Sequence, residues 1–332
     1  MRYRKKPMAY LLGLFVFMLI FPMQALAQPT VDHKLALERA TKAITASVKQ
    51  PEAQFATWNY LALAAAGQNL AGYPVKQVCQ KQLASAQTTA DDSILILTLL
   101  AAGHDPTNFQ GQNLIKKIQA NQLPNGKFAD NSDRSGQGDN NCQVLVNAHI
   151  WAILALYAAG ADIPDEAKAK GWLIDQQHRD GGFNWYTKDN TSDVDSTGMA
   201  LMALGALGEK KDSPVVQRAY TFLKNVQGTK GEYASWGAVN AESCAIAMRG
   251  LLAVGINPLD AELSKPGGNP VTALLSFQLK DGSFSHMAGT DSNEMATQHA
   301  LMALADLYYG KPFEQRLREA KNPTAVTRKG SM

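Results

Sequence analysis

Three carboxylates in this sequence are of the residue types that can form a catalytic site. Asp193 and Asp195 are separated by one residue, and Glu242 follows about fifty residues later. Paired carboxylates that face one another across a cleft can act as acid and base on a glycosidic bond. The same residue types also cap helices, because Asp, Asn and Ser accept hydrogen bonds from the free N–H groups at a helix start. We therefore expect Asp195 to be a cap, with carboxylate chemistry as the alternative.

Other side chains that could do chemistry are more scattered. The segment 129–139 is rich in carboxylates, including Asp130, but it lacks the regular aspartate spacing and terminal glutamate of an EF-hand, so we expect a flexible insertion. His149 lies among Ala, Ile and Leu and is expected to be a hydrogen-bonded core histidine. The sequence contains no Gly-x-Ser-x-Gly elbow, phosphate-binding loop or His-Glu-x-x-His motif, and we expect no cofactor.

A turn that occurs four times indicates how the chain is organised. Each turn contains glycine, ends in an aromatic ring and follows a glutamine by six residues. The rings are Phe128, Phe183, Tyr233 and Phe284, which are 55, 50 and 51 residues apart, and the glutamines are Gln122, Gln177, Gln227 and Gln278. A period of this size holds a pair of helices, and such pairs stack because none can bury its apolar face alone. The aromatic turns should therefore be buried between neighbouring pairs.

Each unit combines two kinds of helix. A polar start leads into an Ala-rich helix with few charges, which should be buried on all sides, and a second, more charged helix should face water on one side. Residues 28–312 hold about six such pairs, which predicts an all-α fold, an α/α toroid with about six inner and six outer helices. The inner-helix starts should form one ligand-binding rim, which contains Asp92, Asn141, Asp195, Glu242 and Asn293.

Two stretches of the chain resemble a known superfamily. The run Gln-x-x-Asp-Gly-Gly-Phe-x-Trp at 177–185, together with residues 193–201, resembles the repeats of squalene and terpene cyclases, protein prenyltransferases and the α-domain of cobalamin carriers. The resemblance covers nearly all of residues 28–312 and implies an α/α toroid. It is specific for the fold and weak for activity, because relatives with very different ligands share these turns.

The resemblance to cyclases implies one catalytic role. Class II cyclases protonate an alkene with the middle aspartate of an Asp-x-Asp-Asp motif, which requires a carboxylic acid that stays protonated. Asp195 would be that acid, preceded by Asp193, but Ser196 replaces the last aspartate of the motif. A cyclase also needs aromatic faces around a carbocation. The candidates are Trp58, Tyr60, Trp151 and Tyr157, although rings at helical spacing are more often core.

The resemblance to the other two groups is less complete. Prenyltransferases bind zinc through an Asp-x-Cys pair and a histidine, which Glu242 and Cys244 approximate, but the histidine position aligns with Ala296 and His299 lies nearly one turn further, so we expect no metal site. Cobalamin carriers close a β-rich domain over the corrinoid, and we find none here. Residues 313–332 are expected to form a polar, frayed tail.

The N-terminus is typical of a signal peptide. A basic stretch, an apolar run from Ala9 to Met23 and the sequence Ala25-Leu26-Ala27 predict cleavage near Ala27 and a secreted or extracytoplasmic protein. Removal of four basic residues changes the formal net charge from +3 to about −1, which argues against nucleic acid as a partner. Three cysteines, Cys79, Cys142 and Cys244, permit one disulfide, whose pairing the sequence does not indicate.

These observations favour a toroid that binds an apolar isoprenoid or a corrinoid in its central mouth without catalysis. The alternatives are an enzyme, either a degenerate class II terpene cyclase with Asp195 as its acid or an enzyme acting on polysaccharide, and a structural module that binds a cell-surface partner protein. The shape of the mouth would distinguish them.

Overall fold

The computed structural model describes residues 32–49, 56–131 and 143–321. The predicted signal peptide, Asn141 and Cys142 lie outside these residues. The part that begins at Asp32 forms a single compact unit, to which the following description applies. Within the described residues, no helix is long and apolar enough to cross a membrane.

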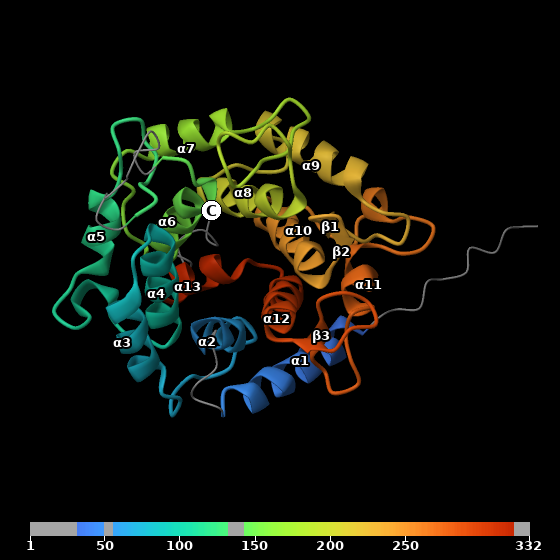
Figure 1. Ribbon diagram of the computed structural model, residues 1–332, viewed down its shortest axis with the longest axis horizontal. Helices are drawn as coiled ribbons and strands as arrows, with labels where there is room; N and C mark the ends of the chain where they lie inside the picture. Colours follow the sequence, from blue (N-terminus) through green and yellow to red (C-terminus); the bar gives the residue numbers. More distant parts are fainter. Residues whose placement is uncertain (1–31, 50–55, 132–142, 322–332) are drawn as a thin grey trace, which may run out of the picture. The chain divides into compact units, whose positions relative to one another are not determined.

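Six helices form an inner ring. Each packs against the next one in the sequence, and α12 packs against α2, so that the ring is closed (Figure 1). Their sequences are rich in Ala and Leu, and nearly every position is buried, as expected for helices covered on all sides. The inner helices are α2 (Ala56–Ala65), α4 (Thr89–Ala101), α6 (Val146–Ala159), α8 (Val194–Ala206), α10 (Ala241–Ala253) and α12 (Glu294–Tyr309).

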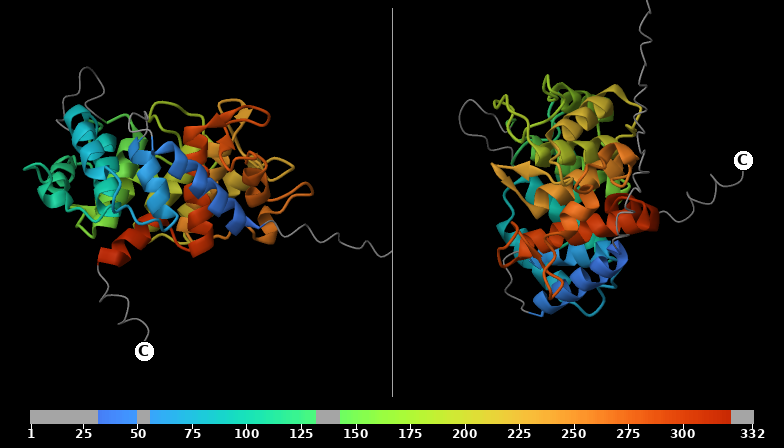
Figure 2. Two further views of the ribbon diagram at one scale, coloured as in Figure 1. Left: turned by 90° about the horizontal axis from the view of Figure 1, so that it is seen from below. Right: turned by 90° about the vertical axis from the view of Figure 1, so that its right-hand side faces the viewer.

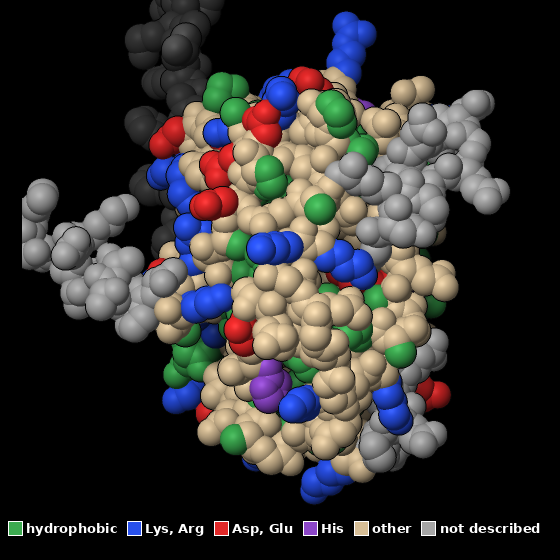
Figure 3. Space-filling view, turned by 90° about the vertical axis from the view of Figure 1, so that its left-hand side faces the viewer, with side chains coloured by type: hydrophobic (Ala, Val, Ile, Leu, Met, Phe, Trp, Pro, Cys, Tyr) green, Lys and Arg blue, Asp and Glu red, His purple; other side chains and the backbone are tan. Residues whose placement is uncertain are grey.

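Six further helices cover the inner ring from outside. They are α1 (His33–Ser47), α3 (Val75–Ser85), α5 (Leu114–Ala120), α7 (Glu166–Asp175), α9 (Pro214–Val226) and α11 (Pro270–Leu275). Helix α1 comes first in the sequence yet packs against α11 and α12, so it occupies the last place in the outer layer. Basic and acidic side chains are interspersed on the outer surface (Figure 3). The predicted all-α toroid with six inner and six outer helices is confirmed for the described residues.

Short irregular elements connect the helices. They are two turns of 3-10 helix, η1 (Pro106–Asn108) and η2 (Ala261–Leu263), and two antiparallel ribbons. The ribbon of β1 (Ala234–Ser235) and β2 (Ala238–Val239) precedes α10, and that of β3 (Phe284–Ser285) and β4 (Ser292–Asn293) precedes α12. Both ribbons therefore lie where the chain enters an inner helix.

The four aromatic turns are buried as predicted, each ring being 0% exposed. In each of these turns the backbone N–H of the aromatic residue donates a hydrogen bond to the side chain of the fourth residue of the next inner helix. The acceptors are His149 Nδ1 at 3.0 Å for Phe128, Thr197 Oγ1 at 3.0 Å for Phe183, Cys244 Sγ at 3.3 Å for Tyr233 and Thr297 Oγ1 at 2.9 Å for Phe284. A shared backbone contact thus sets the orientation of each inner helix.

The glutamines before the turns connect neighbouring units. The side-chain amide of Gln177 donates to the Gly181 carbonyl in its own turn and to the Val215 carbonyl at the start of α9, both at 2.8 Å. Gln278 does the same with Gly282 and with Ala36 of α1, at 3.2 and 2.9 Å. Helix α1 therefore occupies the position of the next outer helix after the last turn, so the outer layer is closed as well.

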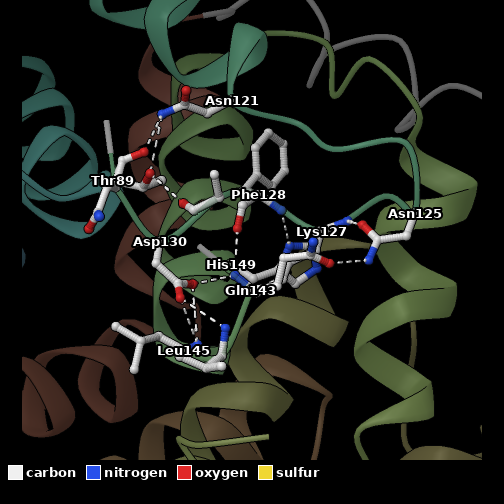
Figure 4. Close-up of polar contacts among 12 residues, drawn as sticks. Thr89, Asn121, Asn125, Lys127, Phe128, Asp130, Gln143, Leu145 and His149 are labelled. Atoms are coloured by element: carbon white, nitrogen blue, oxygen red, sulfur yellow. Dashed lines mark hydrogen bonds and ion pairs between the residues drawn. The ribbon is translucent and has the colours of Figure 1, made fainter. Parts of the chain in front are cut away.

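The turn before α6 contains a group of buried polar side chains (Figure 4). His149 accepts the Phe128 N–H, and its Nε2 lies 3.0 Å from the Ala169 carbonyl, so both ring nitrogens are used and the predicted core histidine is confirmed. Asp130 pairs with the buried Lys127 ammonium and accepts the N–H of Val144 at 2.9 Å. Asp130 is therefore a structural residue, and residues 132–139 of the expected flexible insertion lie outside the described residues.

Helix α13 (Phe313–Lys321) covers one end of the ring and contacts α4, α6 and α12 (Figure 2). Phe313 and Glu314 are each only 2% exposed. The expectation of a frayed tail was wrong for these residues, because their charged side chains pair with groups of the inner helices. We call this end of the ring the base.

Candidate functional site

Helix geometry identifies the side chains that face the centre of the ring. Four residues accept the hydrogen bonds of the aromatic turns and therefore face outward: His149, Thr197, Cys244 and Thr297. Each residue of an α-helix is rotated by about 100° from the one before it. Residues two positions before and two positions after these contacts therefore point roughly the opposite way, inward. The resulting inward set, which we call the mouth, is Asn147 and Trp151 on α6, Asp195 and Met199 on α8, Glu242 and Ile246 on α10, and Met295 and His299 on α12.

The mouth lies at one end of the ring only. The inner-helix starts are held together there by backbone hydrogen bonds, such as Val146 N–H to the Trp185 carbonyl at 2.8 Å and Ala241 N–H to the His286 carbonyl at 3.0 Å. One turn below the mouth the inward residues are small and buried, as at Ala203 and Gly250. A Cβ on Gly250 would lie 2.5 Å from the Gly198 carbonyl oxygen, so α8 and α10 touch through their backbones. The ring interior is filled below the mouth.

Asp193, and not Asp195, caps α8. The Asp193 carboxylate accepts the N–H of Ser196 at 2.7 Å and the Ser196 hydroxyl at 2.7 Å. Ser196 is therefore turned toward the cap and away from the mouth. Asp195 lies at the second position of the helix, and within the described residues its carboxylate accepts no backbone N–H. The expectation that Asp195 is a helix cap was wrong, because the helix begins at Val194, two residues earlier than that interpretation required.

The Asp195 carboxyl is buried without a hydrogen bond on Oδ1. Burial raises the pKa of this carboxyl above its ordinary value, and the negative charges of Asp193 and Glu242 raise it further. The hydroxyls of Ser243 and Ser235 lie close enough to oppose the rise in pKa, but neither forms a hydrogen bond within the described residues. The environment of Asp195 thus favours the protonated acid.

Glu242 lies beside Asp195 at the start of α10. Its side chain is 12% exposed, and its Oε2 lies 2.9 Å from Nδ1 of His286, whose side chain is 44% exposed. His286 belongs to the loop that precedes α12, so this pair connects the mouth with the surface. The two acidic residues differ, because Glu242 has an ion-pair partner and Oδ1 of Asp195 has no hydrogen bond.

Two of the other expected rim residues face elsewhere. Asp92 is buried and pairs with Lys117 of α5 at 2.9 Å, so its carboxylate points to the outer layer. Asn293 caps α12 by accepting the Ala296 N–H at 2.9 Å. It also lines a cavity of about 450 Å³ between α1 and α12, outside the mouth. The rim expectation was therefore wrong for the side chains of Asp92 and Asn293, although both lie near inner-helix starts, and Asn141 is not described.

Aromatic side chains from three inner helices meet in the mouth. The Trp58 ring of α2 contacts the Trp151 ring edge-on at 5.4 Å between centroids, and on its other side it lies 5.5 Å from the His299 ring. All three side chains are partly exposed. Sequence reasoning missed His299 and Asn147 as mouth residues. Alignment of the repeats on the aromatic turns would have found them, because they occupy the same helix positions as Met199 and Asp195.

Cys244 is not arranged as a zinc ligand. Its thiol is buried against the Tyr233 backbone, on the side of α10 opposite to Glu242, and burial raises its pKa to about 12. Zinc binds the thiolate, which this environment disfavours. Cys79 is likewise a buried free thiol.

Comparison with known proteins shows a likeness to terpene cyclases. The family model of the squalene-hopene cyclase N-terminal domain matches residues 140–232, which include Asp193 and Asp195. A squalene–hopene cyclase of Alicyclobacillus acidocaldarius is 26% identical in an alignment of 206 positions that covers 52% of this chain and 32% of that enzyme. The chain thus spans about a third of the length of this relative.

Solved structures show the same fold. The type II terpene cyclase MstE from Scytonema superposes with a TM-score of 0.59 and 14% identity, covering 83% of this chain and 99% of that one. A variant of MstE was solved in complex with its substrate, geranylgeranyl dihydroxybenzoate. The Candida albicans protein geranylgeranyltransferase-I, complexed with GGPP, has a TM-score of 0.54 and 13% identity, covering 84% and 92% of the two chains.

Proposed function

We propose that this chain, which has the α/α-toroid fold of the terpene cyclase and protein prenyltransferase superfamily, binds an isoprenoid in its mouth and starts its cyclisation with a proton from Asp195. The observation that carries the proposal is the Asp195 carboxyl, which points into the mouth, is buried and lacks a partner on Oδ1. A protonated carboxylic acid in such a site is the group that alkene protonation requires.

The step needs no other reactant. The proton moves from the Asp195 carboxyl to one alkene carbon, the π electrons form the new C–H bond, and the other carbon becomes a tertiary carbocation. Asp195 is left as a carboxylate, which stays close to the positive charge. The rings of Trp58 and Trp151, which contact one another in the mouth, would stabilise the cation through their faces.

This proposal departs from the expectation of binding without catalysis. That expectation rested on the predicted location, on the incomplete catalytic motifs and on the interpretation of Asp195 as a cap, a role that Asp193 fills instead. Two similar proteins of known structure carry geranylgeranyl compounds, which supports an isoprenoid ligand. The corrinoid ligand, the cell-surface partner and the extracytoplasmic location stay predictions. Of the three carboxylates in the polysaccharide alternative, Asp193 is committed to the cap of α8, which leaves Asp195 and Glu242.

The test is an activity assay with an Asp195→Asn variant. Purified protein is incubated with squalene and with shorter polyprenyl chains, and products are separated by gas chromatography and mass spectrometry. We expect cyclised product from the wild type and a loss of at least about 100-fold in the variant, because Asn has no acidic proton to donate.

The matched control is Asp165→Asn, which replaces the aspartate cap of the outer helix α7 and should leave the product yield unchanged. If the wild type cyclises none of the chains, the proposed activity is wrong. Quenching of tryptophan fluorescence by the same chains would then decide whether the mouth binds them at all.

A further inference from the structure

A second side chain in the mouth lacks a partner. Nδ1 of His299 is buried and has no hydrogen bond within the described residues. Three other histidines have polar partners. His149 uses both ring nitrogens, His286 pairs with Glu242, and His178 lies 3.0 Å from the Ser192 hydroxyl. A buried ring nitrogen without a hydrogen bond costs stability, which argues for a role that requires it.

The His299 ring is held in place by packing. It lies against Trp58 with the ring planes tilted by 35°, and Trp58 is in turn braced by Trp151. Burial and, to a smaller extent, the positive charge of Arg249 together lower the pKa of His299 to about 4. The ring is therefore neutral near pH 7, and one nitrogen carries a free lone pair.

The acid and this imidazole lie at different depths. Asp195 is the second residue of α8, and His299 is the sixth of α12, with α10 between the two helices. Four residues along a helix correspond to a rise of about 6 Å. The two groups are thus separated both around the ring and along its axis, so one can stay protonated while the other stays neutral.

We propose that His299 is the base that accepts the proton released at the end of the cyclisation, so that the product is a cyclic alkene and not an alcohol. This inference rests on the proposed function. A C–H bond next to the final carbocation breaks, its electron pair forms the C=C bond, and the proton moves to an imidazole nitrogen. The imidazolium then loses the proton to solvent, and Asp195 regains one, so the net reaction is an isomerisation.

Even a weak base suffices for this step, because a carbocation is a very strong acid. Water in the mouth would compete by adding to the cation and giving an alcohol. The packing of His299 against Trp58 places the imidazole on an apolar wall, where it can reach the cation more readily than a water molecule held by polar groups.

The test measures the product ratio in two variants, His299→Gln and His299→Phe, with His104→Gln as the control. His104 lies at the far end of α4, away from the mouth. The wild type and the control should give the cyclic alkene. In the His299 variants, substrate should still be consumed, but the ratio of that alkene to alcohols and displaced alkenes should fall at least tenfold.

Each remaining outcome has a definite meaning. An unchanged ratio in a folded His299 variant would overturn the role of His299 and leave the proposed function standing. Loss of substrate consumption in a variant with a wild-type melting curve would also overturn it, because a terminating base acts after protonation. If the wild type consumes no substrate, the proposed function fails and this inference fails with it. If His299→Phe does not fold, the product ratio of His299→Gln decides the test.

Discussion

The two ends of the inner ring use buried polar groups in opposite ways. At the base, Arg249 of α10 donates to Asp306 at 2.9 Å and to Glu314 at 2.8 Å, and Arg316 pairs with Asp306 at 3.2 Å. At the mouth, Asn147 Oδ1, Asp195 Oδ1 and His299 Nδ1 are buried without hydrogen bonds. Both ends bury polar groups at a cost. The base offsets most of that cost through its ion pairs, although Arg316 Nε there has no hydrogen bond, whereas these three atoms of the mouth have no such partners.

The base is built for stability. Arg249 is 2% exposed, and its two carboxylate partners come from α12 and α13, so one guanidinium connects three helices. Two arginines of α13 also donate hydrogen bonds to carbonyls at the ends of inner helices. Arg316 donates to the Ala65 carbonyl at 2.8 Å, and Arg318 donates to the Tyr157 carbonyl at 3.2 Å. Cations are favourable at helix C-termini. The difference between the ends indicates that unpaired groups at the mouth are kept for a ligand or a reaction.

The largest stability change should follow from breaking the base network. Arg249→Met leaves two buried carboxylates without their shared cation, and we expect a loss of about 3–5 kcal/mol in the free energy of unfolding. Chemical denaturation measures it. Arg179→Met, at an exposed position in a turn, should change stability by less than about 0.5 kcal/mol. Equal stability of Arg249→Met and the wild type would show that the base network is not structural.

In the mouth, removal of a buried charge should instead increase the stability of the folded protein. Asp195→Asn removes a carboxyl whose pKa is raised in the folded protein, so the wild type loses stability as the pH rises from about 4 through that raised pKa. At pH 7 we expect the variant to be more stable by on the order of 1 kcal/mol. Below about pH 4 the difference should vanish.

Thermal unfolding of wild type and Asp195→Asn across this pH range provides the measurement. A variant that is less stable than the wild type at pH 7 would mean that the ionised carboxylate is stabilised by partners, contrary to its assignment as an acid. Asp165→Asn, which alters an exposed cap, should show no gain at pH 7.

The smallest effect concerns the cap of α8. Asp193→Ala removes the acceptor for the Ser196 N–H and should cost roughly 1 kcal/mol, whereas Asp193→Asn should cost less because Asn caps nearly as well. Denaturation midpoints of the two variants provide the comparison. If Asp195→Ala were instead the costlier change, Asp195 would be the cap after all.

Several features could be predicted because they depend on local spacing. The aromatic turns, the two kinds of helix and the core role of His149 follow from residue types that recur at fixed intervals. The choice between Asp193 and Asp195 as cap could not be made with confidence, since it depends on a helix boundary, which sequence patterns locate only to within a residue or two. Helix α13 was missed because its charges are compensated only by residues far away in the sequence.

The sequence by itself determined the repeat, and with it the fold class, because each unit carries the same turn chemistry and none can bury its apolar face alone. It also contained the carboxylates at the inner-helix starts. Only the tertiary structure decided which of them point inward and which are left without a partner. Closure of the ring brings Trp58, Asp195 and His299 from three separate helices to one mouth, and that convergence depends on side-chain direction in three dimensions.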